Sequence, residues 1–359
     1  MASIQTDLTK MLGIRHPIML AGMGTAAGSE LAAAVSNAGG IGVIGGIGYT
    51  PAMLRKKMQE IKADLVDKKA AFGVDLLIPA VGGNARATNY DYTKGQLPQL
   101  IDVIIEEGAK LFVCAVGVPP KWAVDKLHAH GILVMNMIGA PKHVPKALEV
   151  GVDIICAQGG EGGGHTGDIA TAILVPKVVD MCKGRISPLT GKQVPVVAAG
   201  GIYDGRSVAM ALCFGAQAVW VGTRFVCATE AGASRAHQEA VVTADYIDTC
   251  RTLIFSGRPM RVRKTAYVAD WENNRQAEIK ELTNKGIVPA VQDMDTHDYE
   301  DEELLARQAF LMGQVAGSIG DIKPAKEIVE EMVNGAIETL RSRANLVVVS
   351  SGASQSARL

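Results

Sequence analysis

A single histidine stands inside a glycine-rich segment of this chain, and its type and setting suit proton-transfer chemistry. His165 lies within residues 157–168, AQGGEGGGHTGD, directly after the apolar run 152–156. Glycines let the backbone approach a flat or anionic ligand closely, and an imidazole titrates near neutral pH. The pattern predicts a ligand-binding loop that presents a base, while a flexible linker with an incidental histidine would have the same composition.

Two further glycine turns follow apolar runs later in the chain. Ala199-Gly200-Gly201 ends the run 194–199, and Gly222-Thr223 ends the run 218–221. Such turns expose backbone N–H groups, and a threonine hydroxyl adds another polar group, which suits a dianionic phosphate. In a barrel of eight strands the loops after strands seven and eight commonly hold phosphate. The two turns together predict a phosphate site.

The elements that must position these residues alternate between short apolar runs and helix-like segments up to residue 225. This rhythm predicts an α/β fold, a (β/α)8 TIM barrel. A doubly wound sheet is the competitor, but its first turn would carry G-x-G-x-x-G, whereas residues 21–26 read AGMGTA. The expected strands are 17–21, 41–44, 71–76, 111–115, 132–136, 153–156, 194–199 and 218–221.

The alternation of apolar runs and helix-like segments ends after residue 225. Residues 228–303 are charged and are expected to form a helical subdomain, inserted after strand eight over the barrel mouth. The barrel would then comprise 1–227 and 304–345, with closing helices at 302–312 and 324–342, and 346–359 would be a flexible tail. An irregular segment at 79–98 is long for a loop in a compact domain, and such loops are usually functional or disordered.

Composition narrows the class of protein. The net charge of -1 gives no electrostatic basis for binding nucleic acid or an anionic membrane. The 6 cysteines show no C-x-x-C pair and no metal-ligand spacing, so no metal site is predicted. The first residues lack a secretory signal, and no apolar run approaches the length of a membrane span, which predicts a soluble intracellular protein. The ending Ala357-Arg358-Leu359 is a variant of a peroxisomal signal, so the expected location is peroxisomal or cytoplasmic.

A phosphate site beside backbone suited to a planar ring predicts FMN as the cofactor. The segments 21–24 (AGMG), 72–74 (FGV), 161–167 (EGGGHTG), 199–202 (AGGI) and 222–225 (GTRF) resemble those of the nitronate monooxygenase family, in the same order. Members of this family are FMN-dependent TIM barrels. The resemblance implies that His165 is the catalytic histidine. The positions implied to contact the flavin are Ala21, Gly22, Met23, Gln158, Gly163, Gly164, Ala199, Gly200, Gly201, Gly222, Thr223 and Gln314.

The activity implied is oxidation of a nitronate, such as propionate 3-nitronate or an alkyl nitronate, with O2 to give nitrite and a carbonyl compound. His165 would act as a general base on neutral nitroalkanes. Substrate contacts are expected from Asp75, Arg86, Tyr90 and Tyr92, since a cation and hydroxyls suit a nitro or carboxylate group. A solvated loop with ordinary surface residues is the alternative for the last three.

Two residues depart from the family pattern. Asp75 stands where many relatives have Asn, which would alter the charge near the flavin or the substrate preference. Met137 stands where the quinone-reductase branch has Lys. Rival functions on the same scaffold are NAD(P)H-dependent reduction of a quinone or enoyl thioester, and a non-catalytic flavin- or phosphate-binding barrel. The expected partners are a small-molecule nitronate or nitroalkane and O2, with a homodimer possible.

Overall fold

Eight parallel strands form the barrel at the centre of the computed structural model, which describes residues 3–297, 299–344 and 346. The strand order around the sheet is β1-β9-β8-β6-β5-β4-β3-β2, and a parallel bridge between Met19 and Ile41 joins its two ends. The predicted (β/α)8 barrel is therefore confirmed. The strands are β1 (Ile18–Leu20), β2 (Gly42–Gly45), β3 (Phe72–Ile78), β4 (Leu111–Gly117), β5 (Leu133–Ile138), β6 (Ile154–Gln158), β8 (Val196–Ala199) and β9 (Ala218–Val221).

Alternate residues of each strand fill the barrel interior, because successive side chains of a strand point to opposite faces. Leu111 and Val113 of β4 join the interior cluster, whereas Phe112 belongs to the cluster beneath the helices. The helix α1 (Asp7–Leu12) contributes Leu8 and Leu12 to the interior cluster. This helix therefore covers the amino-terminal end of the barrel and leaves the carboxyl end for a site.

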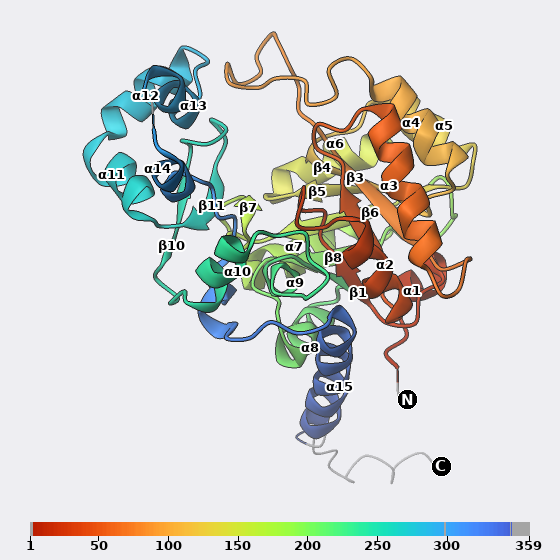
Figure 1. Cartoon of the computed structure of the whole chain (residues 1–359). Helices are drawn as coiled ribbons and strands as arrows, with labels where there is room; N and C mark the ends of the chain where they lie inside the picture. Colours follow the sequence, from red (N-terminus) through yellow and green to blue (C-terminus); the bar gives the residue numbers. More distant parts are fainter. Residues whose placement is uncertain (1–2, 298, 345, 347–359) are drawn as a thin grey trace, which may run out of the picture.

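Helices surround the strands, and the last helix, α15 (Ala325–Ala344), packs against α8 (Gly205–Cys213), which precedes β9 (Figure 1). Gly205 of α8 lies so close to Gly335 of α15 that a Cβ at Gly205 would stand 2.4 Å from the Gly335 carbonyl carbon. These helices are α2 (Ser29–Asn37), α3 (Pro51–Asp64), α4 (Leu97–Glu106), α5 (Lys121–His128), η1 (Pro141–His143), α6 (Val144–Glu149), α7 (Thr171–Cys182), α8 (Gly205–Cys213), α9 (Thr223–Val226) and α15 (Ala325–Ala344).

The segment after β9 is not wholly helical, which corrects one expectation. Residues 249–252 and 260–263, which include part of the charged cluster Arg258–Lys264, form an antiparallel hairpin, and its second strand also pairs with the glycine loop. Met260 and Val262 are buried while Arg261 and Arg263 are half-buried, the alternation of a strand. The elements are α10 (Arg235–Val242), β10 (Thr249–Thr252), β11 (Met260–Arg263), α11 (Ala266–Asn274), α12 (Gln276–Asn284), α13 (Pro289–Thr296), α14 (Asp301–Ala306) and η2 (Gln314–Ser318).

One of the two closing helices expected in this region needs correction. The helix expected at 302–312 ends at Ala306 in α14, and Gln314–Ser318 form a short 3-10 helix instead. The helix expected at 324–342 is present as α15. The insertion has a small core of its own around Trp271, Val268 and Ile254. The proposed domain boundaries themselves stay a prediction.

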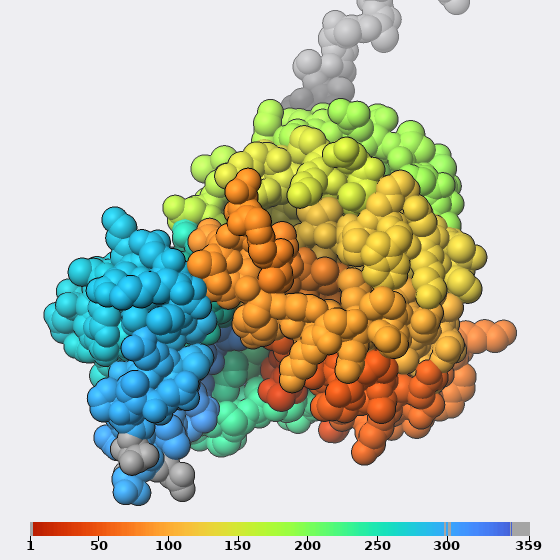
Figure 2. Space-filling model, turned by 90° about the horizontal axis from the view of Figure 1, so that it is seen from above, coloured from red at the N-terminus to blue at the C-terminus, as the bar shows by residue number. Residues whose placement is uncertain are grey.

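The loop before α4 lies alongside the insertion, as Figure 2 shows with this segment in orange and the insertion in cyan to blue. Arg258 Nη1 donates to Asn89 Oδ1 at 2.8 Å, and Gly257, at a φ of 64°, lies so close to Thr88 that a Cβ would clash with it. No helix in the described part of the chain is long and apolar enough to cross a membrane. The tripeptide Ala357-Arg358-Leu359 lies outside the described residues.

Candidate active site

A cavity of about 400 Å³ opens at the carboxyl ends of the barrel strands. Its wall combines residues from β3, β4, β5, β6, β8 and β9 with the turn after β1, the glycine loop and the segment 309–315. Most of the site residues predicted from the sequence lie in this wall. They are Ala21, Gly22, Met23, Asp75, Gln158, Gly163, Gly164, His165, Ala199, Gly200, Gly201, Gly222 and Thr223, together with Met137.

Four predicted site residues lie outside the wall. Gln314 stands between two wall residues, and its backbone N–H donates to the Glu161 carbonyl at 3.0 Å. Arg86 and Tyr90 are exposed on the loop beside the insertion, and Tyr92 is buried beneath Tyr90 with ring centroids 4.1 Å apart. The structure therefore brings Asp75 into the cavity wall but not the other three residues predicted to contact substrate.

One end of the cavity is built from glycines. Gly200 and Gly201 have φ values of 90° and 74°, which non-glycine residues rarely adopt. A Cβ on Gly222 would stand 3.4 Å from Met23 Sδ, so its absence keeps the space open. The Thr223 hydroxyl oxygen accepts a hydrogen bond from the Gly313 N–H at 2.9 Å. At this end of the cavity a ligand can approach the backbone closely, because no side chain stands in between.

Glu161 holds the glycine loop against the barrel, a role that its sequence position alone did not indicate. Its carboxylate accepts hydrogen bonds from the Thr171 N–H at 3.0 and 3.1 Å and from the Thr171 hydroxyl at 2.9 Å, at the first turn of α7. Gln158 Nε2 donates to the His165 carbonyl at 3.0 Å. The available signal in the sequence was an acid ten residues before the start of α7, because a carboxylate can accept hydrogen bonds from the free N–H groups of a helix's first turn.

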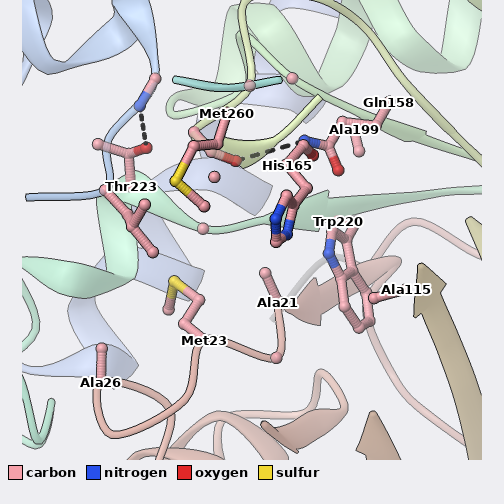
Figure 3. Close-up of a pocket in the computed structure, with 18 of the residues that line it drawn as sticks. Ala21, Met23, Ala26, Ala115, Gln158, His165, Ala199, Trp220, Thr223 and Met260 are labelled. Carbon is pink, nitrogen blue, oxygen red and sulfur yellow. Dashed lines mark hydrogen bonds between the residues drawn. The ribbon is translucent and has the colours of Figure 1, made fainter. Parts of the chain in front are cut away.

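His165 reaches the cavity from a two-residue strand, β7 (Gly164–His165), which pairs with Met260 and Arg261 of β11. Figure 3 shows its ring pointing into the space above Ala21, between Met23 and Trp220. Its Nε2 lies 2.9 Å from the Ser256 hydroxyl of the insertion. Burial, assisted by the charge of Arg258, lowers the pKa of His165 to about 4. The imidazole is therefore neutral at neutral pH.

Asp75 is a buried acid at the floor of the cavity. Its side chain is 2% exposed, and Oδ1 has no hydrogen-bond partner among the described residues. Burial raises the pKa of Asp75 well above its usual value, and the hydrogen bond from the Ala115 N–H offsets only part of this effect. In the described part of the chain no Lys, Arg or His pairs with this carboxyl. The raised pKa favours the protonated form, which would present an O–H to a ligand in the cavity.

The residues around the cavity fit FMN. The glycine end suits a phosphate, and Ala21, Met23 and Trp220 provide an apolar wall that suits a planar ring. The unpartnered Asp75 Oδ1 supplies a polar atom that a ring heteroatom can satisfy. These features follow from the side chains present, and the predicted flavin contacts residue by residue stay a prediction.

Comparison with known proteins adds four findings. A family model described as nitronate monooxygenase matches residues 5–335. A 5-hydroxy-7a-methyl-1-oxo-octahydro-1H-indene-4-carboxyl-CoA dehydrogenase of Mycobacterium tuberculosis is 31% identical, with 96% of this chain and 99% of that protein covered. A probable nitronate monooxygenase of Staphylococcus saprophyticus is 31% identical, with 72% and 78% covered. The structure of FabK from Thermotoga maritima has a TM-score of 0.78 and 31% identity, with 96% and 100% covered.

Proposed function

Because this chain belongs to the nitronate monooxygenase family of flavin oxidoreductases, we propose that it oxidises nitronates with O2, using FMN. Two nitronate ions and one O2 then give two carbonyl compounds and two nitrite ions. The observation that carries the proposal is a half-buried His165 with a lowered pKa in a cavity that fits FMN, with the positive charge of Arg258 beside it. Such an environment favours an electron-rich anion over a neutral ligand.

His165 holds and moves the proton in this scheme. Its pKa of about 4 leaves the imidazole unprotonated, so it can accept a proton from the α-carbon of a neutral nitroalkane. The Ser256 hydroxyl at 2.9 Å fixes the ring orientation. FMN, when bound, supplies the electron acceptor that passes electrons from the substrate to O2. The apolar wall at Met23 and Trp220 excludes water from the reacting face.

The test is anaerobic mixing of FMN-loaded protein with propionate 3-nitronate, followed by admission of air. We expect the flavin absorbance to change before air enters, and nitrite and carbonyl product to form in equal amounts afterwards. Unchanged flavin absorbance with nitronate and full bleaching by NADH would overturn the proposal. Protein with His165→Asn is the comparison variant: it keeps the cavity and, because a preformed nitronate needs no proton removed, it should react much as the unmodified protein does.

A second candidate is redox chemistry on a coenzyme A thioester. The similarity to the carboxyl-CoA dehydrogenase of Mycobacterium tuberculosis extends over 96% of this chain, including the insertion, whereas the nitronate monooxygenase of Staphylococcus saprophyticus covers 72%. In this candidate His165 would move a proton at the carbon next to the thioester carbonyl. Incubation with an enoyl-CoA and NADPH, with the thioester followed by mass, separates the two: a mass gain of two hydrogens supports the second candidate.

A further inference from the structure

Two arginines lie beside the candidate active site with no carboxylate partner among the described residues. Arg258 is half-buried, and its one side-chain partner there is Asn89 Oδ1 at 2.8 Å. Arg86 is exposed on the neighbouring loop. A guanidinium has five N–H donors, so the bond to Asn89 leaves most donors of Arg258 available. Buried or half-buried arginines usually satisfy their donors with carboxylate or phosphate oxygens.

The charge of Arg86 acts on Arg258, and the charge of Arg258 acts on His165. Burial lowers the pKa of Arg258, the nearby charge of Arg86 lowers it further, and only Tyr92 acts in the opposite direction. The charge of Arg258 in turn helps to lower the pKa of His165. No acidic side chain contributes to either shift. Like charges this close repel each other, so a positive potential stands next to the cavity.

The backbone connects this pair directly to the reacting group. The Ser256 hydroxyl lies 2.9 Å from His165 Nε2 and 3.4 Å from both the backbone N and O of Arg258. Met260, two residues further on, is part of the cavity wall. The arginine therefore stands within one short turn of the histidine, but outside the wall that would enclose a flavin.

We propose that Arg258 and Arg86, with the Tyr92 hydroxyl, bind an anionic oxygen group of the substrate, a carboxylate or a phosphate, at the end away from the atom that meets His165. The inference rests on the proposed function only in taking His165 as the group that meets the reacting atom. A purely structural role for Arg258, anchoring the 79–98 loop through Asn89, accounts for one donor and leaves Arg86 unexplained.

Binding tests this proposal without turnover. FMN-loaded protein is titrated anaerobically with 3-nitropropionate, 1-nitropropane or coenzyme A, and dissociation constants are read from the change in flavin absorbance. We expect 3-nitropropionate to bind at least tenfold more tightly than 1-nitropropane, and Arg258→Gln to abolish that preference. Arg86→Gln should reduce it, and Arg258→Lys should restore part of it. Arg235→Gln is the matched control, because Arg235 is exposed on α10 and pairs with Glu239.

The arms of the experiment separate the two anion sources. Tight, Arg258-dependent binding of coenzyme A with no preference for 3-nitropropionate assigns the pair to phosphate, and the reverse assigns it to carboxylate. Equal binding of all probes to the unmodified protein, or a preference that survives Arg258→Gln, would overturn the proposal. If Arg258→Gln fails to fold, the salt dependence of the preference in the unmodified protein decides: a preference unchanged by 1 M NaCl contradicts it. Since nitronate oxidation is measured separately, either proposal can fail alone.

Discussion

His165, carried by the barrel, and Ser256, carried by the insertion, lie with imidazole Nε2 and hydroxyl oxygen 2.9 Å apart. The histidine of the candidate site is thus oriented by a residue from a different part of the chain. Ser256 is buried, so water does not readily replace its hydroxyl.

Replacing Ser256 with Ala removes this bond and leaves the histidine in place. We expect kcat for a neutral nitroalkane to fall by about tenfold or less, the usual effect of one hydrogen bond. His165→Asn should reduce the same rate by about 10²–10⁴-fold, because a positioned base is lost. Steady-state nitrite release measures both. Rates on preformed nitronate, which needs no proton removed, serve as the control, and equal losses on both substrate forms would contradict this assignment.

The acid limb of activity should follow the lowered pKa of His165. With a pKa of about 4, the imidazole stays neutral from the alkaline side down to mildly acidic pH, so kcat/KM for a neutral nitroalkane should be flat there and fall only towards pH 4. Arg258→Gln removes a nearby positive charge and should move this limb to higher pH. A limb at the ordinary histidine value of 6.5 in the unmodified protein would show that the ring is solvated.

His165 also makes the folding stability of the protein depend on pH. Since the folded-state pKa of His165 lies below the value of 6.5, the unfolded chain binds the proton more readily between pH 6.5 and about 4. Its contribution is full above pH 6.5 and is lost as the pH falls to 4. Urea unfolding of the unmodified protein and of His165→Asn should therefore converge in stability across this window as the pH is lowered. Parallel curves would contradict the burial of the ring.

Asp75 makes folding stability depend on pH with the opposite sign to His165. Because its folded-state pKa is raised, the folded protein binds the proton more tightly, and stability falls as the pH rises above 3.8 towards the folded-state value. Asp75→Asn keeps the shape and cannot ionise. We expect its Tm relative to the unmodified apoprotein to increase between pH 4 and pH 8. Asp180→Asn, at an exposed site on α7, is the control and should show no such increase.

The glycines at one end of the cavity predict that a larger side chain there will reduce the retention of FMN. Gly222→Val places atoms within contact of Met23 and inside the cavity, so the purified protein should be folded and largely colourless. Gly320→Val is the matched control, because a Cβ there meets nothing within 4 Å. Gly201 is less suitable, since its φ of 74° would strain any side chain. Full flavin occupancy in Gly222→Val would show that the cofactor lies elsewhere.

The barrel and most of its cavity wall were predictable because their signals are local. Each strand is a short apolar run, and Gly200, Gly201 and Gly222 stand directly after strands, where the fold brings loops together. The partners of the central residues were not predictable. Ser256 meets His165 across 91 residues, and Arg261 donates to the Gly160 carbonyl across 101. Nothing in either local sequence indicates that contact.

The hairpin of the insertion was missed for a related reason. The charged residues at 258, 261, 263 and 264 led us to predict a helix here. Met260 and Val262 alternate with these residues, however, and face a small core built around Trp271. That core forms only once the hairpin meets later helices. Arg86 and Tyr92 were predicted to contact substrate; they lie outside the cavity wall, and the charged side chain that they act on is Arg258.

The pairing of β7 with β11 makes the histidine's own backbone part of the insertion's sheet. The insertion therefore cannot be exchanged without also changing the strand that pairs with the backbone of His165. A chimera that carries a relative's segment in place of residues 228–303 would inherit a new setting for the base as well as a new entrance. We expect substrate range and the proton affinity of His165 to change together in such a chimera.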